Sequence, residues 1–294
     1  MLLPSRDTGP HEVRSMAEIA IMAHMMVFFL GGYLFYTFKP DLAAHPFHLQ
    51  FLLLFLAAFT AGIFVEGLQS MIPGRTASLR DIGANITGAM IFLSLKNWNN
   101  ITRYIPFHVS VIAITAIFLW PFFRSVTDEV IAHSQFPLLA GFETPFEDTR
   151  FIRGTGRFSI SNTHAFYGGN SLQVKMGTQA YSGFALEYMP RNWRGYSYLQ
   201  FAVYNPQEDD VTIHTRIHDT WHANSGRMIY ADRFNRIFHI PPQEWTVIKI
   251  PLEEIKNAPR SRKMDMAKIT NMGFYVAREP DPLTLYIDDI RLLR

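Results

Sequence analysis

Residues 49–65 read LQFLLLFLAAFTAGIFV, a run without a single charged side chain. A helix needs about 20 such residues to cross the roughly 30 Å hydrocarbon core of a bilayer, and the run reaches this length when residues 66–68 are included. The alternative is a helix buried in the bundle of a soluble protein, and the length and chargelessness of the run argue against it. The run therefore predicts a membrane-spanning helix and an integral membrane protein.

Three more apolar segments surround this one, at residues 19–38, 82–95 and 105–123. The first and the last are long enough to cross a bilayer. The middle one is short, so it needs flanking residues to complete a crossing, or shielding by its neighbours. Ser78 and Asp81 have the spacing of a capping box, which predicts where this third helix begins. We therefore expect an α-helical membrane bundle of about four transmembrane helices.

The character of the sequence changes beyond residue 123, where polar and charged side chains replace the apolar runs. Stretches that alternate apolar and polar residues then follow, as strands with one buried face do. They lie at 157–161, 171–175, 211–217, 245–250 and 283–288. Short strands with regular turns between them indicate an all-β jelly-roll sandwich.

The overall composition narrows the classes of function. The formal net charge is only +2 and the basic residues are scattered, which argues against a nucleic-acid partner. Cys is absent, which excludes disulfides and thiolate metal sites. The changes along the chain predict four parts: a polar N-terminal segment at 1–16, a transmembrane helical domain at 17–124, a linker at 125–136 and a β-sandwich at 137–294.

Polar residues near the ends of the first three apolar segments form a candidate site, because ionisable groups at membrane depth are costly and mark function by default. The set is His24, Glu66, Gln69, Arg75, Ser78, Asp81 and Asn85. If the chain crosses the bilayer back and forth, these segment ends meet on one side. With four crossings the β-sandwich lies on that side as well. A structural alternative stays open, in which Arg75 pairs with Glu66 or Asp81 and fixes the hairpin between two helices.

These polar motifs resemble the signature of the VanZ-like membrane family over about residues 17–123. The resemblance is carried by His24 ahead of FFLG at 28–31, EGLQ at 66–69, PGRTAS at 73–78 and DIGANITG at 81–88. The family is named for an accessory protein of resistance to the glycopeptide teicoplanin, and most members have no assigned activity. The resemblance thus implies a cell-envelope protein with a part in envelope or glycopeptide-antibiotic tolerance, and it implies no particular reaction.

The C-terminal part resembles galactose-binding-like jelly-roll domains of the carbohydrate-binding-module type. The matching stretches are GFE at 141–143, GGNSL at 168–172, WTVIKIPL at 245–252 and LYIDDIRL at 285–292. In such modules a structural Ca²⁺ is often held by an acidic residue near the first strand and an Asp in the last. Glu143 with Asp288 or Asp289 matches those places, and carboxylate oxygens suit a hard cation. The alternative is that Asp288 and Asp289 end a strand in solvent.

Residues 218–235 are the stretch of the β-sandwich richest in polar and aromatic side chains. Sugar sites commonly combine an aromatic face, stacked on the sugar ring, with planar polar groups that bond the hydroxyls. The predicted ligand-binding residues are Trp221 and Tyr230 as faces, with Asp219, His222, Asp232, Arg233 and Asn235 as polar partners. A loop with a core aromatic residue and surface charges is the alternative.

The function hypothesis is a multi-pass protein of the bacterial inner (plasma) membrane whose β-sandwich binds a glycan. Its partners are membrane lipid and a glycan or lipid-linked glycan. The distribution of basic residues among the loops slightly favours a cytoplasmic β-sandwich. Modules of the type that the β-sandwich resembles normally face the exterior, so we expect the β-sandwich outside the cytoplasm. No catalytic residue is assigned. One alternative is an intramembrane enzyme with Glu66 or Asp81 as general base and His24 as its partner. Another is a plain membrane anchor that displays an interaction domain.

Overall fold

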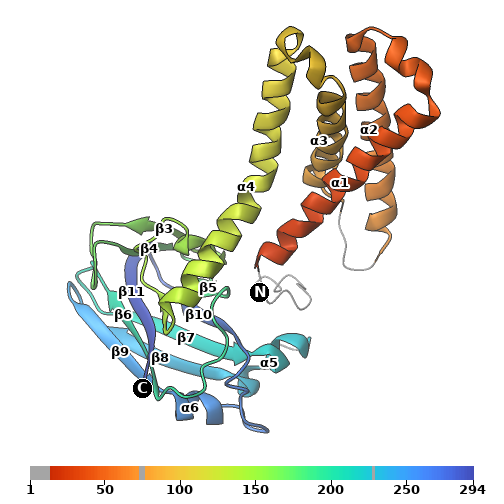
Figure 1. Ribbon diagram of the computed structural model, residues 1–294. Coiled ribbons are helices and arrows are strands. Elements are labelled where there is room, and N and C mark those ends of the chain that lie inside the picture. Colours follow the sequence, from red (N-terminus) through yellow and green to blue (C-terminus); the bar gives the residue numbers. More distant parts are fainter. Residues whose placement is uncertain (1–13, 73–76, 227–228) are drawn as a thin grey trace. The chain divides into compact units, whose positions relative to one another are not determined.

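The computed structural model describes residues 14–72, 77–226 and 229–294. The chain divides into two compact units, a helical unit that ends at Val126 and a β unit that begins at Thr127 (Figure 1). Each unit has an apolar core of its own. The predicted combination of a helical N-terminal region with a β-sheet domain is confirmed.

Long helices make up most of the helical unit. They and the 3₁₀ turns between them are α1 (Arg14–Phe38), η1 (Pro40–Ala44), α2 (Phe47–Ser70), α3 (Leu79–Lys96), η2 (Trp98–Arg103) and α4 (Ile105–Gln135). Helices α1, α2 and α4 are long and apolar enough to cross a membrane. Helix α3 has 18 residues and carries Arg80, Asp81 and Lys96. Three candidate spans are compatible with membrane insertion, and the fourth stays a prediction.

Large apolar side chains cover the outside of the candidate spans. Val27 of α1, Phe64 of α2 and Ile117 of α4 expose 61%, 66% and 70% of their surface. Soluble monomers rarely expose contiguous apolar surface of this kind. The exterior of these helices is therefore suited to lipid, which supports the membrane prediction independently of helix length.

Helix α3 packs against both α1 and α2. Its side chains Ala84 and Leu93 are fully buried. Gly88 permits this packing, because a Cβ there would overlap the backbone oxygen of Met25 in α1. Small residues allow such close approach between helices in lipid. The predicted start of α3 is confirmed, since Ser78 Oγ accepts a hydrogen bond from the backbone N–H of Asp81 (3.3 Å).

The segment at 125–136, expected to be a linker, is helical, because α4 continues to Gln135. Asp128 in its last turns is 1% exposed, and both of its carboxylate oxygens accept hydrogen bonds from the fully buried Arg150. The distances are 3.0 Å (Nε to Oδ1), 3.1 Å (Nε to Oδ2) and 2.9 Å (Nη2 to Oδ1). A buried guanidinium requires such partners. The end of α4 is therefore part of the β unit.

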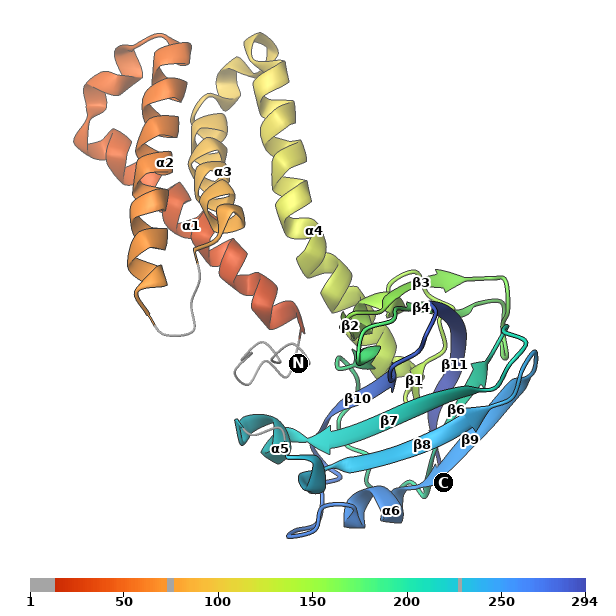
Figure 2. The same ribbon diagram turned by 180° about the vertical axis from the view of Figure 1, so that it is seen from behind.

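The β unit is a sandwich of two antiparallel sheets (Figure 2). The six-stranded sheet has the order β3-β4-β11-β6-β9 with β1 paired to β11, and the five-stranded sheet has the order β2-β5-β10-β7-β8. The strands are β1 (Leu138–Ala140), β2 (Phe151–Arg153), β3 (Arg157–Ser161), β4 (Ser171–Met176), β5 (Ser182–Leu186), β6 (Tyr198–Tyr204), β7 (Val211–Asp219), β8 (Phe234–Ile240), β9 (Trp245–Pro251), β10 (Ile269–Val276) and β11 (Leu283–Leu293). The short helices are η3 (Glu147–Arg150), α5 (Thr220–Asn224), η4 (Tyr230–Asp232) and α6 (Leu252–Asn257).

The predicted sandwich is confirmed, and β3, β4, β7, β9 and β11 lie where the alternating stretches predicted strands. Ile213 and Ile217 of β7 point into the core between the sheets. Because successive strand residues point to opposite faces, His214, Arg216 and His218 lie on the other side. We call that side, which faces away from the core, the outer face of the five-stranded sheet.

Candidate functional sites

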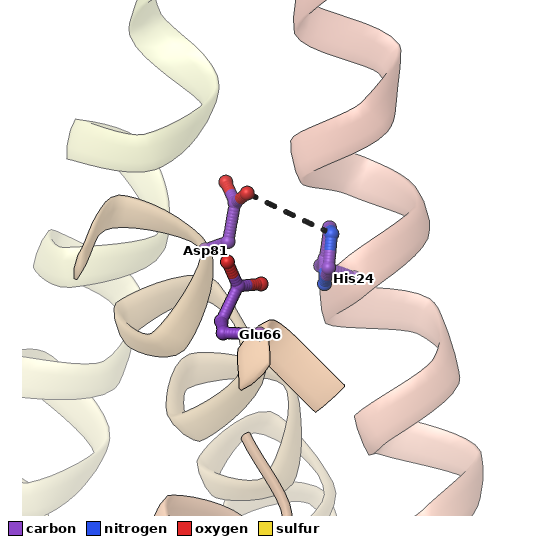
Figure 3. Close-up of side chains that lie close together, drawn as sticks. All are labelled: His24, Glu66 and Asp81. Atoms are coloured by element: carbon purple, nitrogen blue, oxygen red, sulfur yellow. Dashed lines mark ion pairs between the residues drawn. The ribbon is translucent and has the colours of Figure 1, made fainter. Parts of the chain in front are cut away.

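Three ionisable side chains from three helices converge in the helical unit (Figure 3). They are His24 of α1, Glu66 of α2 and Asp81 of α3, and one nitrogen or oxygen atom from each lies within 4.8 Å of the others. His24 Nε2 lies 3.9 Å from Asp81 Oδ2. The convergence that the connectivity predicted is therefore present in the structure.

Neighbouring polar groups hold these side chains in place. His24 Nδ1 lies 2.9 Å from Asn85 Oδ1, one helical turn beyond Asp81. The backbone N–H of Ser78 donates to Glu66 Oε2 (2.8 Å). Glu66 is 2% exposed, and its Oε1 has no hydrogen-bond partner among the described residues. The cluster thus joins three helices, and the described residues supply no donor to one of its buried carboxylate oxygens.

One member of the predicted membrane site, Gln69, does not join this cluster. Its side chain is half-buried and makes no hydrogen bond with any residue that the structure describes. Arg75 lies outside the described residues. The structural alternative, in which Arg75 pairs with a carboxylate of the cluster, therefore stays a hypothesis.

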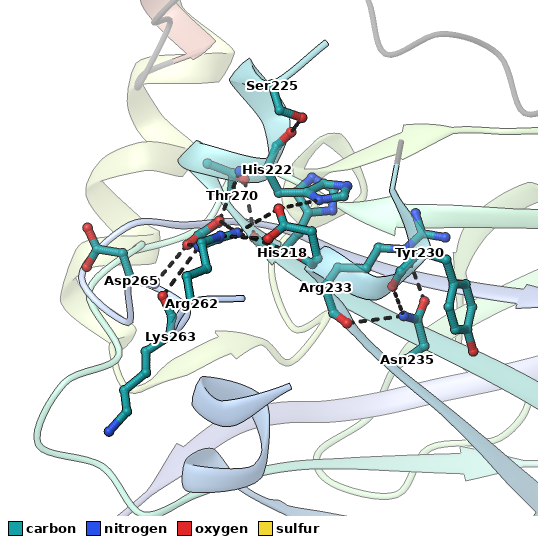
Figure 4. A network of polar contacts seen from close by, with 12 residues as sticks. His218, His222, Ser225, Tyr230, Arg233, Asn235, Arg262, Lys263, Asp265 and Thr270 are labelled. Carbon is teal, nitrogen blue, oxygen red and sulfur yellow. Dashed lines mark hydrogen bonds and ion pairs between the residues drawn. The ribbon is translucent and has the colours of Figure 1, made fainter. Parts of the chain in front are cut away.

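A second polar network lies where β7 ends, around the turn of helix α5 (Figure 4). Arg262 Nη1 lies 2.5 Å from Asp219 Oδ2, and Arg262 Nε donates to Asp232 Oδ1 (2.7 Å). His222 Nδ1 lies 3.1 Å from Asp232 Oδ2, and its backbone N–H donates to Asp219 Oδ1 (3.1 Å). Three of the predicted ligand-binding residues thus meet around Arg262, which the sequence analysis did not select.

The charges of this network satisfy one another. Burial opposes ionisation of Asp219, but the hydrogen bonds from Arg262, Asp265 and His222 hold the pKa of its carboxyl below the usual value. Burial also opposes the charge of Arg262, but the hydrogen bonds that Arg262 donates to Asp232 and Asp219 raise its pKa. We infer that these carboxylates stabilise the loops, and that they are not free to bind a ligand.

Polar side chains of three neighbouring strands cover the outer face of the five-stranded sheet. Arg216 of β7 lies opposite Gly273 of β10 and Asn235 of β8, and His218 of β7 lies opposite Asn271 of β10. A Cβ at Gly273 would lie 2.7 Å from Arg216 Nε. The glycine therefore lets the guanidinium group lie close against the sheet.

Buried polar atoms in this region lack hydrogen-bond partners within the described part of the chain. They are Arg216 Nε and Nη1, Arg233 Nη1, His218 Nδ1, His222 Nε2 and Asn271 Oδ1. Burial lowers the pKa of Arg216, and the positive charge of Arg233 lowers it further. Buried polar groups are normally paired, so this accumulation of unpaired polar atoms, three of them guanidinium N–H donors, indicates a place where a ligand completes the hydrogen bonding.

Exposed aromatic rings flank these donors. Trp221 on α5 exposes 70% of its surface and Tyr230 exposes 66%. The guanidinium carbon of Arg233 lies 5.7 Å from the centroid of the Tyr230 ring, and Arg233 Nε donates to Asn235 Oδ1 (3.0 Å). Tyr and Trp rings are enriched at binding interfaces, because they combine an apolar face with a polar group. Within the predicted ligand-binding set, Trp221 and Tyr230 are thus exposed, Asn235 is half-buried, and Arg233 is buried with one N–H group unpaired.

The histidines of this region lie closer together than their sequence spacing indicates. The rings of His218 and His222 have centroids 4.8 Å apart although one lies on a strand and the other in a helical turn. Burial lowers the pKa of His218 to about 3, and His222, Arg216 and Arg233 contribute to the same shift. Burial also lowers the pKa of His222. Both rings are therefore neutral at neutral pH.

The predicted Ca²⁺ ligands accept hydrogen bonds from protein groups. Glu143 Oε1 and Asp288 Oδ2 each accept two backbone N–H groups of the loop at 166–170. Asp289 is paired with Arg291. Burial raises the pKa of Asp288 to about 6. Ca²⁺ takes about six to eight oxygen ligands, whereas this loop offers N–H donors to the carboxylates. The residues as placed do not by themselves fit the ion, which stays a prediction.

Comparisons with known proteins concern the fold of about half the chain. No protein-family model and no curated protein matches the sequence. A family 11 carbohydrate-binding module from Clostridium thermocellum, solved with a β-1,3-1,4-mixed-linked tetrasaccharide, is 17% identical and matches 53% of this chain and 94% of its own with a TM-score of 0.39. The xylan-binding domain of a family 22 module is 20% identical and matches 53% and 92%, with a TM-score of 0.34. An exo-β-agarase is 15% identical and matches 53% of this chain and 25% of its own, with a TM-score of 0.43.

Proposed function

We propose that this protein is a multi-pass membrane protein of the bacterial cell envelope whose β unit binds an acidic glycan. The observation that carries the proposal is the group of unused donors on Arg216 and Arg233, next to the exposed ring of Tyr230, together with the exposed Trp221 on α5. An aromatic ring offers a flat apolar face to a sugar ring. Arginine binds carboxylate or phosphate groups in a planar, two-point geometry.

The preference for an acidic glycan follows from the charge balance of the region. The carboxylates of Asp219 and Asp232 are taken up by Arg262. Burial and the positive charge of Arg233 lower the pKa of Arg216 by more than the nearby Tyr275 and Glu187 raise it. A ligand that supplies negative charge and hydrogen-bond acceptors relieves this repulsion. A neutral sugar supplies only the acceptors.

The proposal also assigns this binding function to a membrane surface. Its apolar exterior and its three candidate spans support insertion. The resemblance of its polar motifs to the VanZ-like family supports a bacterial envelope setting, a part in glycopeptide-antibiotic tolerance, and contact with the same glycan or with its lipid carrier. We further propose that the β unit lies outside the cytoplasm, where finished envelope glycans are found.

Calorimetric titration with uronic-acid and neutral oligosaccharides tests the binding proposal on a fragment of residues 127–294, which form a compact unit. We expect saturable binding that weakens about tenfold, or ~1.4 kcal/mol, in Trp221→Ala. Because Trp221 is 70% exposed, stability should not change. Tyr167→Ala is the matched control, since Tyr167 is 61% exposed and packs beside Arg291 of the other sheet. Equal losses in both variants, or no binding by the wild type, would refute the proposal.

The proposed location has a separate test. A reporter enzyme that is active only outside the cytoplasm is fused after Arg294 in the full chain. The account expects an active reporter. A stable but inactive fusion protein would place the β unit in the cytoplasm and exclude finished envelope glycans as its ligands.

A further inference from the structure

The cluster in the helical unit has the composition of a metal site. An imidazole and two carboxylates, from α1, α2 and α3, point towards one another (Figure 3). We propose that His24, Glu66 and Asp81 bind one divalent transition-metal ion of the Zn²⁺ or Mn²⁺ type. This site is separate from the glycan-binding surface, and the proposal does not depend on glycan binding.

The spacing of the ligand atoms is close to that of a metal centre. The three candidate atoms lie within 4.8 Å of one another, and His24 Nε2 and Asp81 Oδ2 are 3.9 Å apart. Bonds of about 2.0–2.1 Å to Zn²⁺ place tetrahedral ligands roughly 3.3 Å apart. Side-chain rotations that shorten these distances by up to about 1.5 Å are therefore enough to coordinate the ion. Three protein ligands leave a coordination position open for water or a substrate oxygen.

The hydrogen bonds around the cluster orient its ligands. His24 Nδ1 lies 2.9 Å from Asn85 Oδ1. When Nδ1 carries the proton and donates to this oxygen, the lone pair of Nε2 points to Asp81, which is the usual support of a metal-binding histidine. The Ser78 N–H holds Glu66 Oε2 and leaves the buried Oε1 without a partner among the described residues. Oε1 is therefore the oxygen available to the ion.

Charge balance supplies the driving force. With a neutral imidazole, the two carboxylates carry a charge of about −2 in a region of low dielectric constant, where uncompensated charge is costly. A divalent cation brings the cluster to neutrality, whereas protonation of His24 alone does not. One nitrogen and two oxygen ligands suit Zn²⁺ or Mn²⁺, and they are too few for Ca²⁺, which takes about six to eight oxygens.

The test uses the full chain purified in detergent. The protein is loaded with Zn²⁺, dialysed against metal-free buffer and assayed for bound metal, and Co²⁺ is used as a spectroscopic probe of the same site. We expect about one Zn²⁺ per chain, a melting temperature that falls on chelation, and visible Co²⁺ absorption bands that show nitrogen and oxygen coordination. His24→Ala and Asp81→Asn should each lower metal affinity about tenfold or more. His48→Ala, at an exposed histidine of α2, should not.

The outcomes that overturn the proposal are distinct. The site does not exist if the wild type retains no Zn²⁺ and shows no Co²⁺ bands, a result that needs no variant to fold. Metal held equally by His24→Ala and the wild type would also refute it, because the ion would then lie elsewhere. If the wild type binds no metal and Arg75→Gln is less stable than the wild type, Arg75 supplies the positive charge that balances the cluster, and the proposal is wrong. Metal binding that survives Arg75→Gln supports the proposal.

Discussion

The two polar clusters of this molecule differ in how completely their charges are paired. In the β unit, Asp219 is fully buried, and Arg262 bonds both it and Asp232. In the helical unit, Glu66 is almost as buried, yet one of its oxygens has no partner within the described part of the chain. A buried cluster whose groups satisfy one another stabilises the fold. A buried cluster with unused ligand atoms is a place for something that is still to bind.

The largest expected effect concerns a fully paired group. Asp128→Asn removes the carboxylate that accepts three hydrogen bonds from the fully buried Arg150, and it leaves Glu147, 3.5 Å away, as the remaining carboxylate partner. Breaking a buried ion pair by removing one partner typically costs about 3–5 kcal/mol. We expect a loss of this size in the free energy of unfolding of residues 127–294, measured in urea. Glu253→Gln, which removes an exposed pair with Lys256, is the control and should change nothing measurable. Equal stabilities would show that the Arg150 pair is not structural.

The pairing of Asp219 gives the next effect. Arg262→Gln removes the guanidinium that bonds both carboxylates of the network. Asp219 keeps two backbone N–H donors, from His222 and Asp265, so we expect a smaller loss of about 2–3 kcal/mol. Urea unfolding measures it. If Arg262→Gln instead leaves stability unchanged and abolishes glycan binding, the network belongs to the binding site and our division of roles is wrong.

Gly88 tests the packing that brings the membrane cluster together. A methyl group there would overlap the backbone oxygen of Met25, so α1 and α3 must separate in Gly88→Ala. Overpacking of this kind costs about 1–3 kcal/mol. Gly31→Ala is the matched control, because a Cβ at Gly31 meets nothing within 4 Å. Thermal unfolding in detergent should distinguish the two variants, and equal melting temperatures would contradict the observed contact.

The last effect is a dependence on pH, which is small within any one pH unit. His218 has a pKa of about 3 in the folded chain against an ordinary value of 6.5. Its stabilising contribution is therefore complete above pH 6.5 and is lost as the pH falls, since only the unfolded chain takes up the proton. We expect the stability of the wild type relative to His218→Asn to fall by about 1.4 kcal/mol per pH unit between pH 6 and 4. Denaturation at several pH values measures this difference, and parallel profiles would contradict it.

The wild type must be compared with His218→Asn because protonation of Asp288 changes the stability in the opposite direction. Its pKa is raised to about 6, so the folded chain gains a proton before the unfolded chain does, and stability from this group rises as the pH falls towards 3.8. Asp288 is present in both proteins and cancels in the comparison.

The sequence predicted those parts of the fold that have one buried face. Strands β3, β7 and β9 alternate buried and more exposed residues, and the alternation reveals them. Strands β5 and β10 are buried on nearly every side chain. Neither strand shows a period of two, because the outer-face side chains of β10 are covered by neighbours such as Arg216. The sequence also did not reveal that residues 125–135 continue helix α4. The burial of Asp128 in this segment depends on Arg150, which lies 22 residues further along the chain.

The candidate sites were predictable to different extents. Helix connectivity alone brought His24, Glu66 and Asp81 together, because consecutive antiparallel helices return to the same level. In the β unit the sequence selected residues by type within one stretch. It could not separate Asp219, which is paired, from Trp221, which is exposed. Arg216 and Arg262 were missed because strand pairing and a distant loop, not sequence spacing, bring them to the site.

The central claim is that the unpaired donors of Arg216 and Arg233 bind a ligand. The most direct test compares the affinities of two matched ligands. A uronic-acid oligosaccharide and its carboxyl-reduced, neutral counterpart are titrated separately into the wild type and into Arg216→Gln. The account predicts that the wild type binds the acidic ligand at least about tenfold more tightly, or ~1.4 kcal/mol, and that Arg216→Gln loses this preference. Equal affinities of the wild type for the two ligands, or binding of neither, would contradict it.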